Sequence, residues 1–171
     1  MKKYIICLIL AISWSLLASA QIQREFFGYK FGVCTETEFL NGLKSQNIVY
    51  KKLVIHEATS YIVNNSNLMF EGKKWPSISF TFMGGKFDNI EFRATEEDLP
   101  IDELKKRTIQ LKEKYDAFFD KRSTYQTKKL LIMHFKDGKS YLTVRYGYNM
   151  FDEYIEMSAY FDSKHHPDLL E

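Results

Sequence analysis

Side chains that commonly carry out chemistry are few in this chain, and they do not form known motifs. A metal site is favoured by a His-x-x-x-His helix or by Cys and His pairs at ligand spacing, and neither pattern occurs. There is also no Gly-x-Ser-x-Gly elbow, phosphate-binding loop or dinucleotide fingerprint. His165 and His166 stand in a polar tail that we expect to be solvated. We therefore predict no metal ligand, no cofactor and no catalytic residue.

One enzymatic hypothesis stays open on the remaining residues. Asp88, Glu91, Asp152 and Glu153 are carboxylates of the kind that glycosidases use in pairs, but the sequence sets no separation between them. Acids are also common at turns and on strand surfaces. A small envelope enzyme of hydrolase type would have to use these acids or His134. A deep pocket that converges on that histidine would favour this alternative.

Cys34 is the only cysteine after position 20, so it has no internal disulfide partner in that part of the chain. It precedes a predicted helix start, where a thiol pKa is lowered, and this favours a reactive thiol or an intermolecular bridge. The simpler interpretation is a small buried apolar residue. Because no histidine near it in the sequence stands out as a base, we favour the buried residue.

Aromatic and basic strand residues stand out as a binding surface. We predict a binding site at Tyr141, Tyr154, Tyr160, His134 and Arg145, on the sheet face away from the helices. Tyrosine and arginine on a rigid, partly apolar surface are typical of protein recognition. Aromatic residues also suit exposed strands without any partner. Further residues are expected on this face: Leu130 and Ile132, with Met83, Phe87 and Arg93 in the first half.

A predicted β-hairpin over residues 76–93 is the element around which the fold is organised. In PSISFTFMGGKFDNIEFR, apolar residues alternate with Ser and Thr, so the period is two and one face is apolar. Gly84-Gly85 allows the positive φ angles of a tight turn. A three-residue loop, Gly84 to Lys86, would set Phe80 opposite Ile90. A two-residue loop would turn these side chains to opposite faces, so we predict three.

The last third of the chain is predicted as a three-stranded meander after residue 127. Asp137-Gly138 is typical of a two-residue hairpin turn. A four-residue loop, Asn149–Asp152, would then align Val144 with Met157 on the apolar face. On the other face this register pairs Arg145 with Glu156 and Tyr141 with Tyr160.

Two helices are predicted. Thr35 and Glu38 have the spacing of a capping box, followed by an apolar stripe that ends near Ser45. The second helix opens at Glu96, and its stripe recurs every three or four residues as far as Phe118. Lys121 and Arg122 are expected to close it, as the helix dipole favours.

The first 20 residues have the outline of a signal peptide: Lys2-Lys3, an apolar run, and a small-residue cleavage site at 18–20. We therefore expect an exported, periplasmic or secreted product without a transmembrane segment after signal removal. Loss of two of the 24 basic side chains leaves no excess over the 22 acidic ones. The composition thus provides no electrostatic reason to expect nucleic acid as a partner.

Residues 21–171 are expected to form a single α+β domain with a polar tail from about residue 163. In this fold an antiparallel sheet has two helices packed on one face. The order of elements, helix then strands, occurs twice, at 35–93 and 96–162, and this leaves a tandem repeat open.

The run FFGYKFGV before a Thr/Glu-capped helix, followed by EGKKWPSISFTFMGGKFDNIEF, resembles small exported proteins of the β-lactamase inhibitory protein type and the small outer-membrane assembly lipoproteins. The resemblance covers most of the chain after residue 20 and consists of Gly, Trp and aromatic packing positions. It implies short helices on one face of an antiparallel sheet. The lipoprotein cysteine and the two disulfide loops of the inhibitor are absent, so no site residue is carried over.

Taken together, these residues favour a non-enzymatic module that binds a protein or peptide through the open face of its sheet. A small envelope enzyme is one alternative. The other is a purely structural envelope component, in which the aromatic face packs on another copy or another domain.

Overall fold

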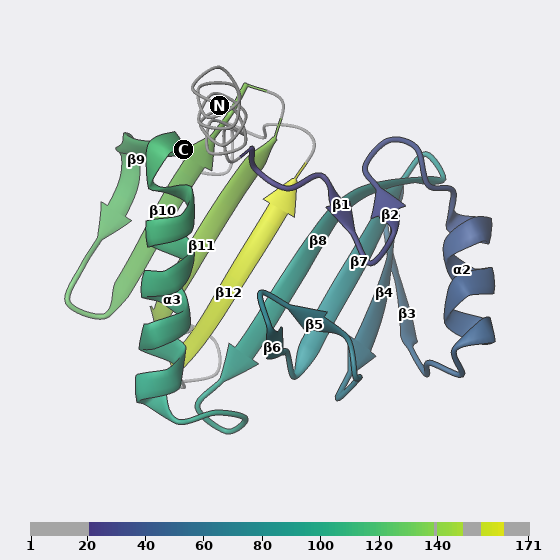
Figure 1. Cartoon of the computed structure of the whole chain (residues 1–171), viewed down its shortest axis with the longest axis horizontal. Helices are drawn as coiled ribbons and strands as arrows, with labels where there is room; N and C mark the ends of the chain where they lie inside the picture. Colours follow the sequence, from purple (N-terminus) through teal and green to yellow (C-terminus); the bar gives the residue numbers. More distant parts are fainter. Residues whose placement is uncertain (1–20, 139, 149–154, 163–171) are drawn as a thin grey trace, which may run out of the picture.

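The computed structural model of the chain describes residues 21–138, 140–148 and 155–162. Its main feature is an eight-stranded antiparallel sheet in the order β3-β4-β7-β8-β12-β11-β10-β9 (Figure 1). The predicted signal peptide and the predicted tail from residue 163 lie outside the described residues. The small hairpins are β1 (Glu25–Phe26) with β2 (Tyr29–Lys30), and β5 (Met69–Phe70) with β6 (Lys73–Lys74). The sheet strands are β3 (Lys51–Ile55), β4 (Ala58–Asn64), β7 (Ser77–Met83), β8 (Lys86–Thr95), β9 (Phe119–Gln126), β10 (Leu130–Lys136), β11 (Tyr141–Tyr148) and β12 (Ile155–Asp162).

The helices α2 (Glu36–Ser45) and α3 (Ile101–Tyr115) and both small hairpins lie on one face of this sheet (Figure 1). We call it the inner face, and the opposite one the open face. Apolar residues along the middle of the inner face are fully buried, as the alternation predicts. They include Ile78, Phe80, Ile90, Phe92, Ala94, Leu142, Val144, Met157, Ala159 and Phe161.

The expected α+β class is wrong, and so is the tandem repeat that the order of elements left open, although the two helices do lie on one face of the sheet. Strands take up 51% of the described residues and helices 21%, so the chain is mostly β. Between the helices, the centre of the inner face is covered by the two small hairpins (Figure 1). Phe26 and Phe70 reach from these hairpins to Phe92, with the Phe70 and Phe92 rings stacked at 4.1 Å. Within the described part of the chain, β5–β6 has no counterpart after α3, so the two halves are not equivalent units.

The second helix is also shorter than predicted. It ends at Tyr115, a 3-10 turn covers Asp116–Phe118, and β9 follows directly at Phe119. Lys121 and Arg122 therefore lie in an edge strand and do not close the helix. A membrane-spanning helix needs a longer apolar stretch than either α2 or α3, the two α-helices of the described residues, provides.

The start of α2 follows the predicted capping box. The Thr35 side chain accepts from the Glu38 amide at 3.2 Å, and the Glu38 carboxylate accepts from the Thr35 amide at 2.8 Å. The Glu38 carboxylate also accepts from the Thr35 hydroxyl at 2.7 Å, and the bonds that it accepts from the Thr35 amide and hydroxyl hold the pKa of Glu38 below its usual value. The helix buries Phe39 and Leu43, and Phe39 packs on Phe80 of β7.

The β7–β8 hairpin has the predicted pairing in its body but a different turn. Ile78 pairs with Phe92 and Phe80 with Ile90, as expected. The turn is the two-residue Gly84-Gly85, with φ angles of 57° and 73°. The register shifts by one residue between Thr81 and Phe82, where β8 has a bulge. The extra residue in β8 restores the facing that a two-residue turn alone would have reversed.

The C-terminal meander keeps its predicted faces but not its predicted register. Lys136 pairs with Tyr141, so four residues, 137–140, separate the strands in place of two. Val144 lies opposite Ala159 and not opposite Met157. Each observed register differs from the predicted register by two residues, which is an even number, so the same side chains stay on the inner face. The predicted loop Asn149–Asp152 lies outside the described residues.

Strands β8 and β12 form the central seam of the sheet. Residues 89–95 of β8 pair with residues 156–162 of β12, which joins the first four strands of the sheet to the last four. The seam is built from segments more than 60 positions apart in the sequence, so it depends on long-range pairing.

Candidate functional site

Four of the five predicted binding residues are described, and all four lie half-buried on the open face. His134 comes from β10, Arg145 and Tyr141 from β11, and Tyr160 from β12, three neighbouring strands. The fifth, Tyr154, lies outside the described residues. We call the four described residues the open-face cluster.

Cross-strand register arranges this cluster in rows. One row contains His134, Thr143, Tyr160 and Glu91, each paired with the next across neighbouring strands. The Nδ1 atom of His134 is 3.0 Å from the Thr143 hydroxyl, which fixes the imidazole ring against the sheet. The row two residues further along contains Arg145, Ser158 and Arg93.

An ion-pair network lies beside these rows. Glu156 is 5% exposed, and its Oε2 is 2.8 Å from Nη2 of Arg93. Its Oε1 is 3.9 Å from Nε of Arg145. Ser158 lies between the two arginines in the register and is small enough to let both reach toward Glu156. A buried carboxylate needs such partners, because desolvation of an unpaired charge costs several kcal/mol, on the order of the whole folding free energy.

Two titratable groups in the first row are shifted by burial. Desolvation raises the pKa of Glu91, Glu156 raises it further, and Arg93 and Arg145 oppose the shift. Burial also raises the pKa of Tyr160, with Asp162, Asp88 and Glu91 acting in the same direction. Tyr160 is therefore a neutral phenol at physiological pH, able to donate a hydrogen bond. At the edge of the cluster, Nζ of Lys136 lies 5.4 Å from the Tyr141 ring centroid.

Three predicted details of this face are wrong. Arg145 lies opposite Ser158, so its contact with Glu156 is diagonal, and Tyr141 lies opposite Asp162 in place of Tyr160. Both follow from the two-residue difference in register.

The third wrong detail is Phe87. It is fully buried on the inner face, in contact with Phe31, because the β8 bulge turns it inward. Leu130, Ile132, Met83 and Arg93 lie on the open face by register, as expected.

Cys34 fits the simpler interpretation. It is 8% exposed, its thiol donates to the Thr35 carbonyl at 3.3 Å, and burial raises its pKa, with Glu38 adding to the shift. A thiol in this state is a poor nucleophile.

In the described part of the chain, no group of three or more His, Cys, Asp or Glu side chains is placed to hold a metal ion. Of the four acids considered for catalysis, Asp152 and Glu153 lie outside the described residues.

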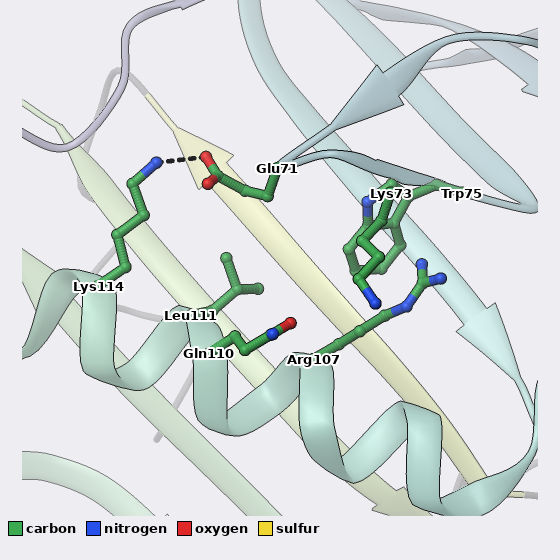
Figure 2. A pocket seen from close by; sticks show the side chains of 7 residues that line it. All are labelled: Glu71, Lys73, Trp75, Arg107, Gln110, Leu111 and Lys114. Atoms are coloured by element: carbon green, nitrogen blue, oxygen red, sulfur yellow. Dashed lines mark hydrogen bonds and ion pairs between the residues drawn. The ribbon is translucent and has the colours of Figure 1, made fainter.

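The sequence did not indicate a second site, a pocket of about 240 Å³ between α3 and the β5–β6 hairpin (Figure 2). Lys114 is joined to Glu71 at one end, and Arg107 extends toward Trp75 at the other (Figure 2). The pocket is lined by Glu71, Lys73, Trp75, Arg107, Gln110, Leu111 and Lys114. The sequence signal that was available for this pocket is the i,i+4 spacing of Glu103 and Arg107. The structure shows that Arg107 is only 6% exposed, so this pair is not an ordinary solvated pair of a helix surface.

Arg107 holds this region together. Its Nε contacts Glu103 at 3.1 Å, its Nη1 donates to the Lys74 carbonyl at 2.8 Å, and its guanidinium carbon lies 4.8 Å from the Trp75 ring centroid. Lys73 also contacts Glu103, at 2.9 Å. Helix α3 is thereby fixed to the β5–β6 hairpin by charge-assisted bonds, in which the Arg107 side chain is buried and Lys73 and Glu103 are partly exposed.

Comparison with known proteins gives no relative to guide the assignment. No family model matches the chain. Neither the curated proteins nor the solved structures contain a significant match.

Proposed function

We propose that this chain is an exported, non-enzymatic module that binds a protein or peptide through the open face of its sheet. The observation that supports the proposal is the open-face cluster, His134, Tyr141, Arg145 and Tyr160, on three adjacent strands. Both helices and both small hairpins of the described chain lie on the other face (Figure 1).

The cluster has the properties of a recognition surface. Its side chains stand on paired strands, so little conformational freedom is lost when a partner binds. Arg93 and Arg145 keep 37% and 32% of their side chains exposed while Glu156 orients them. Their outward N–H groups can therefore donate to carbonyl or carboxylate groups of a partner. Tyr141 and Tyr160 add flat, partly apolar contact area beside them.

A partner can be identified and its affinity measured in one scheme. The wild-type chain serves as bait in extracts of the cell envelope, and a recovered protein is purified for titration. We expect the Tyr141→Ala/Tyr160→Ala double variant to bind that partner at least about tenfold more weakly, as expected when hot-spot aromatics are truncated.

The matched control is Tyr50→Ala/Tyr148→Ala, which removes two exposed tyrosines outside the cluster. Circular dichroism checks that both double variants are folded. Equal affinity of the cluster variant and the wild type would overturn the proposal. Sedimentation of the wild-type chain alone tests the structural alternative, because a face that packs on another copy gives a dimer that the cluster variant weakens.

A further inference from the structure

The pocket between α3 and the β5–β6 hairpin combines an apolar base with charged walls. Trp75 and Leu111 are 2% and 3% exposed, and they form its apolar part. Gln110 and Leu111 extend from α3 toward the gap, and Trp75 stands on the opposite side after β6 (Figure 2). A small ligand that entered here would bury an apolar group on an indole ring.

The walls are basic on balance. Three cationic side chains, Lys73, Arg107 and Lys114, share two carboxylates, those of Glu71 and Glu103. Each cation is already oriented by an ion pair, and Arg107 is also stacked on the indole of Trp75. The unshared positive charge faces a partly enclosed space where water screens it less than at an open surface.

The hairpin that closes the pocket is held in an unusual backbone conformation. Its turn, Glu71-Gly72, has φ angles of 52° and 67°, so Glu71 is a non-glycine residue in the left-handed region. The same Glu71 makes the ion pair to Lys114 across the pocket. The turn and the helix are thus joined at the mouth of the pocket, which keeps its shape defined.

We propose that this pocket binds a small organic carboxylate, a carboxylate group attached to a short apolar or aromatic group. The carboxylate takes up the unshared positive charge of Lys73 and Arg107, and the Gln110 amide donates to it. The apolar group packs on Trp75 and Leu111. A volume of about 240 Å³ limits the ligand to a small molecule or to the last residue of a peptide. These two sources share the recognised chemistry, and the experiment separates them.

Trp75 makes the test direct. The chain has two tryptophans, and the other, Trp14, lies in the predicted signal peptide. In a Trp14→Phe background, Trp75 is the only tryptophan whether or not the first 20 residues are removed, and excitation selective for tryptophan reports on it alone. We expect 3-phenylpropionate and N-acetylphenylalanine to change its fluorescence in a saturable way, with Kd about 1 mM or tighter for ligands of this size. N-acetylphenylalanine amide, which lacks the carboxylate, is expected to bind at least about tenfold more weakly.

The variants locate the binding. Lys73→Gln is expected to weaken both acids at least about fivefold, in proportion to one lost charge-assisted contact. Lys105→Gln removes the charge of a lysine of α3 that lies outside the pocket, and it serves as the control for loss of a lysine. Calorimetric titration repeats each measurement without relying on Trp75, and circular dichroism confirms that the variants are folded.

Each outcome decides the proposal. Saturable binding of both acids identifies a free organic acid as the ligand class, and binding of N-acetylphenylalanine alone identifies a peptide C-terminus. Equal binding of the acid and its amide overturns recognition of a carboxylate. Equal effects of Lys73→Gln and Lys105→Gln, or no saturable binding, overturn the site. None of these results bears on the open-face cluster, because its side chains alternate along β10, β11 and β12 with the buried side chains of the inner face.

Discussion

At the scale of single residues, the open face contains charges that the sheet has withdrawn from water. Glu156 is compensated by two arginines, whereas Glu91 is compensated only in part. Desolvation is the largest influence on Glu91, and its pKa is raised despite Arg93 and Arg145. The protonated form of Glu91 is therefore favoured more by the folded state than by the unfolded state.

This difference predicts a pH dependence for Glu91→Gln. A carboxyl whose folded-state pKa is raised stabilises the fold at pH values below its unfolded pKa, and that contribution is lost as the pH rises through the folded pKa. We expect the variant to gain stability relative to the wild type as the pH increases from about 4 to 7. Urea unfolding of both proteins across this range measures the difference. A stability difference that does not change with pH would show that Glu91 is not desolvated in this way.

A second residue-scale prediction concerns two buried tyrosines. The Tyr115 hydroxyl is buried and has no hydrogen-bond partner among the described residues, whereas the Tyr61 hydroxyl donates to the Glu36 carboxylate. We expect Tyr115→Phe to leave the free energy of unfolding unchanged or raise it by up to about 1 kcal/mol, and Tyr61→Phe to lower it by about 1–2 kcal/mol. Urea denaturation tests the pair. A larger loss for Tyr115→Phe than for Tyr61→Phe would contradict the prediction.

At the scale of elements, alternation along the strands predicted which side chains face inward but not how the strands are aligned. Facing depends only on whether a register is odd or even, so a two-residue difference at Val144 left the buried set intact. The sequence did not reveal the bulge beside the Gly84-Gly85 turn, because these residues satisfy the turn rules for a two-residue loop as well as for a three-residue loop. Phe87 was misplaced for that reason.

For the helices too, the sequence predicted features that depend on local hydrogen bonds and missed those that depend on distant contacts. The capping box predicted the start of α2 because its two reciprocal hydrogen bonds are local. The end of α3 was missed because Phe118 continues the apolar spacing although the chain has already left the helix. The pocket depends on contacts between α3 and a hairpin about 30 positions earlier, and no local pattern records such contacts. Of the candidate sites, only the open-face cluster was within reach of sequence periodicity.

Close packing of β11 against the β9–β10 turn leads to a prediction for Gly147→Ala. Gly147 has a φ of +144°, and a Cβ atom there would collide with the Lys129 carbonyl oxygen. We expect a loss of stability of about 2 kcal/mol or more, because backbone atoms must move. Gly138→Ala is the control, since its φ is +84° but no atom lies within 4 Å, and it should cost only about 1 kcal/mol of strain. Thermal unfolding ranks the two, and equal losses would exclude the close approach.

The edge strand β3 supplies the other element-scale prediction. All five of its residues are exposed, with Val54 at 59% and Ile55 at 56%, and one side of its backbone has no neighbouring strand in the described chain. An apolar edge of this kind favours intermolecular strand pairing. We expect Val54→Lys to slow aggregation on heating, measured by light scattering, with little change in the midpoint of unfolding. An unchanged aggregation rate would show that β3 is not the edge responsible.

At the scale of the whole molecule, one sheet continues through both halves of the chain. The β8–β12 seam joins strands that are distant in the sequence, and Arg107 of α3 is bonded to the β5–β6 hairpin of the first half. Neither half buries its inner face without the other, because Phe161 of β12 packs on Phe26 and Phe70 of the small hairpins. A fold closed by long-range contacts of this type is expected to unfold as one cooperative unit.

Cooperativity across the seam is testable with Trp75, which reports on the first half, and a substitution in the second. Met157 is fully buried on β12, opposite Ala94 of β8. In the Trp14→Phe background, we expect Met157→Ala to lower the free energy of unfolding by about 2–5 kcal/mol, equally by Trp75 fluorescence and by far-UV circular dichroism. Ile109→Ala, a change at a side chain 55% exposed, should alter neither signal. If Met157→Ala left the Trp75 transition in place while the dichroism transition moved, the two halves would be separate folding units.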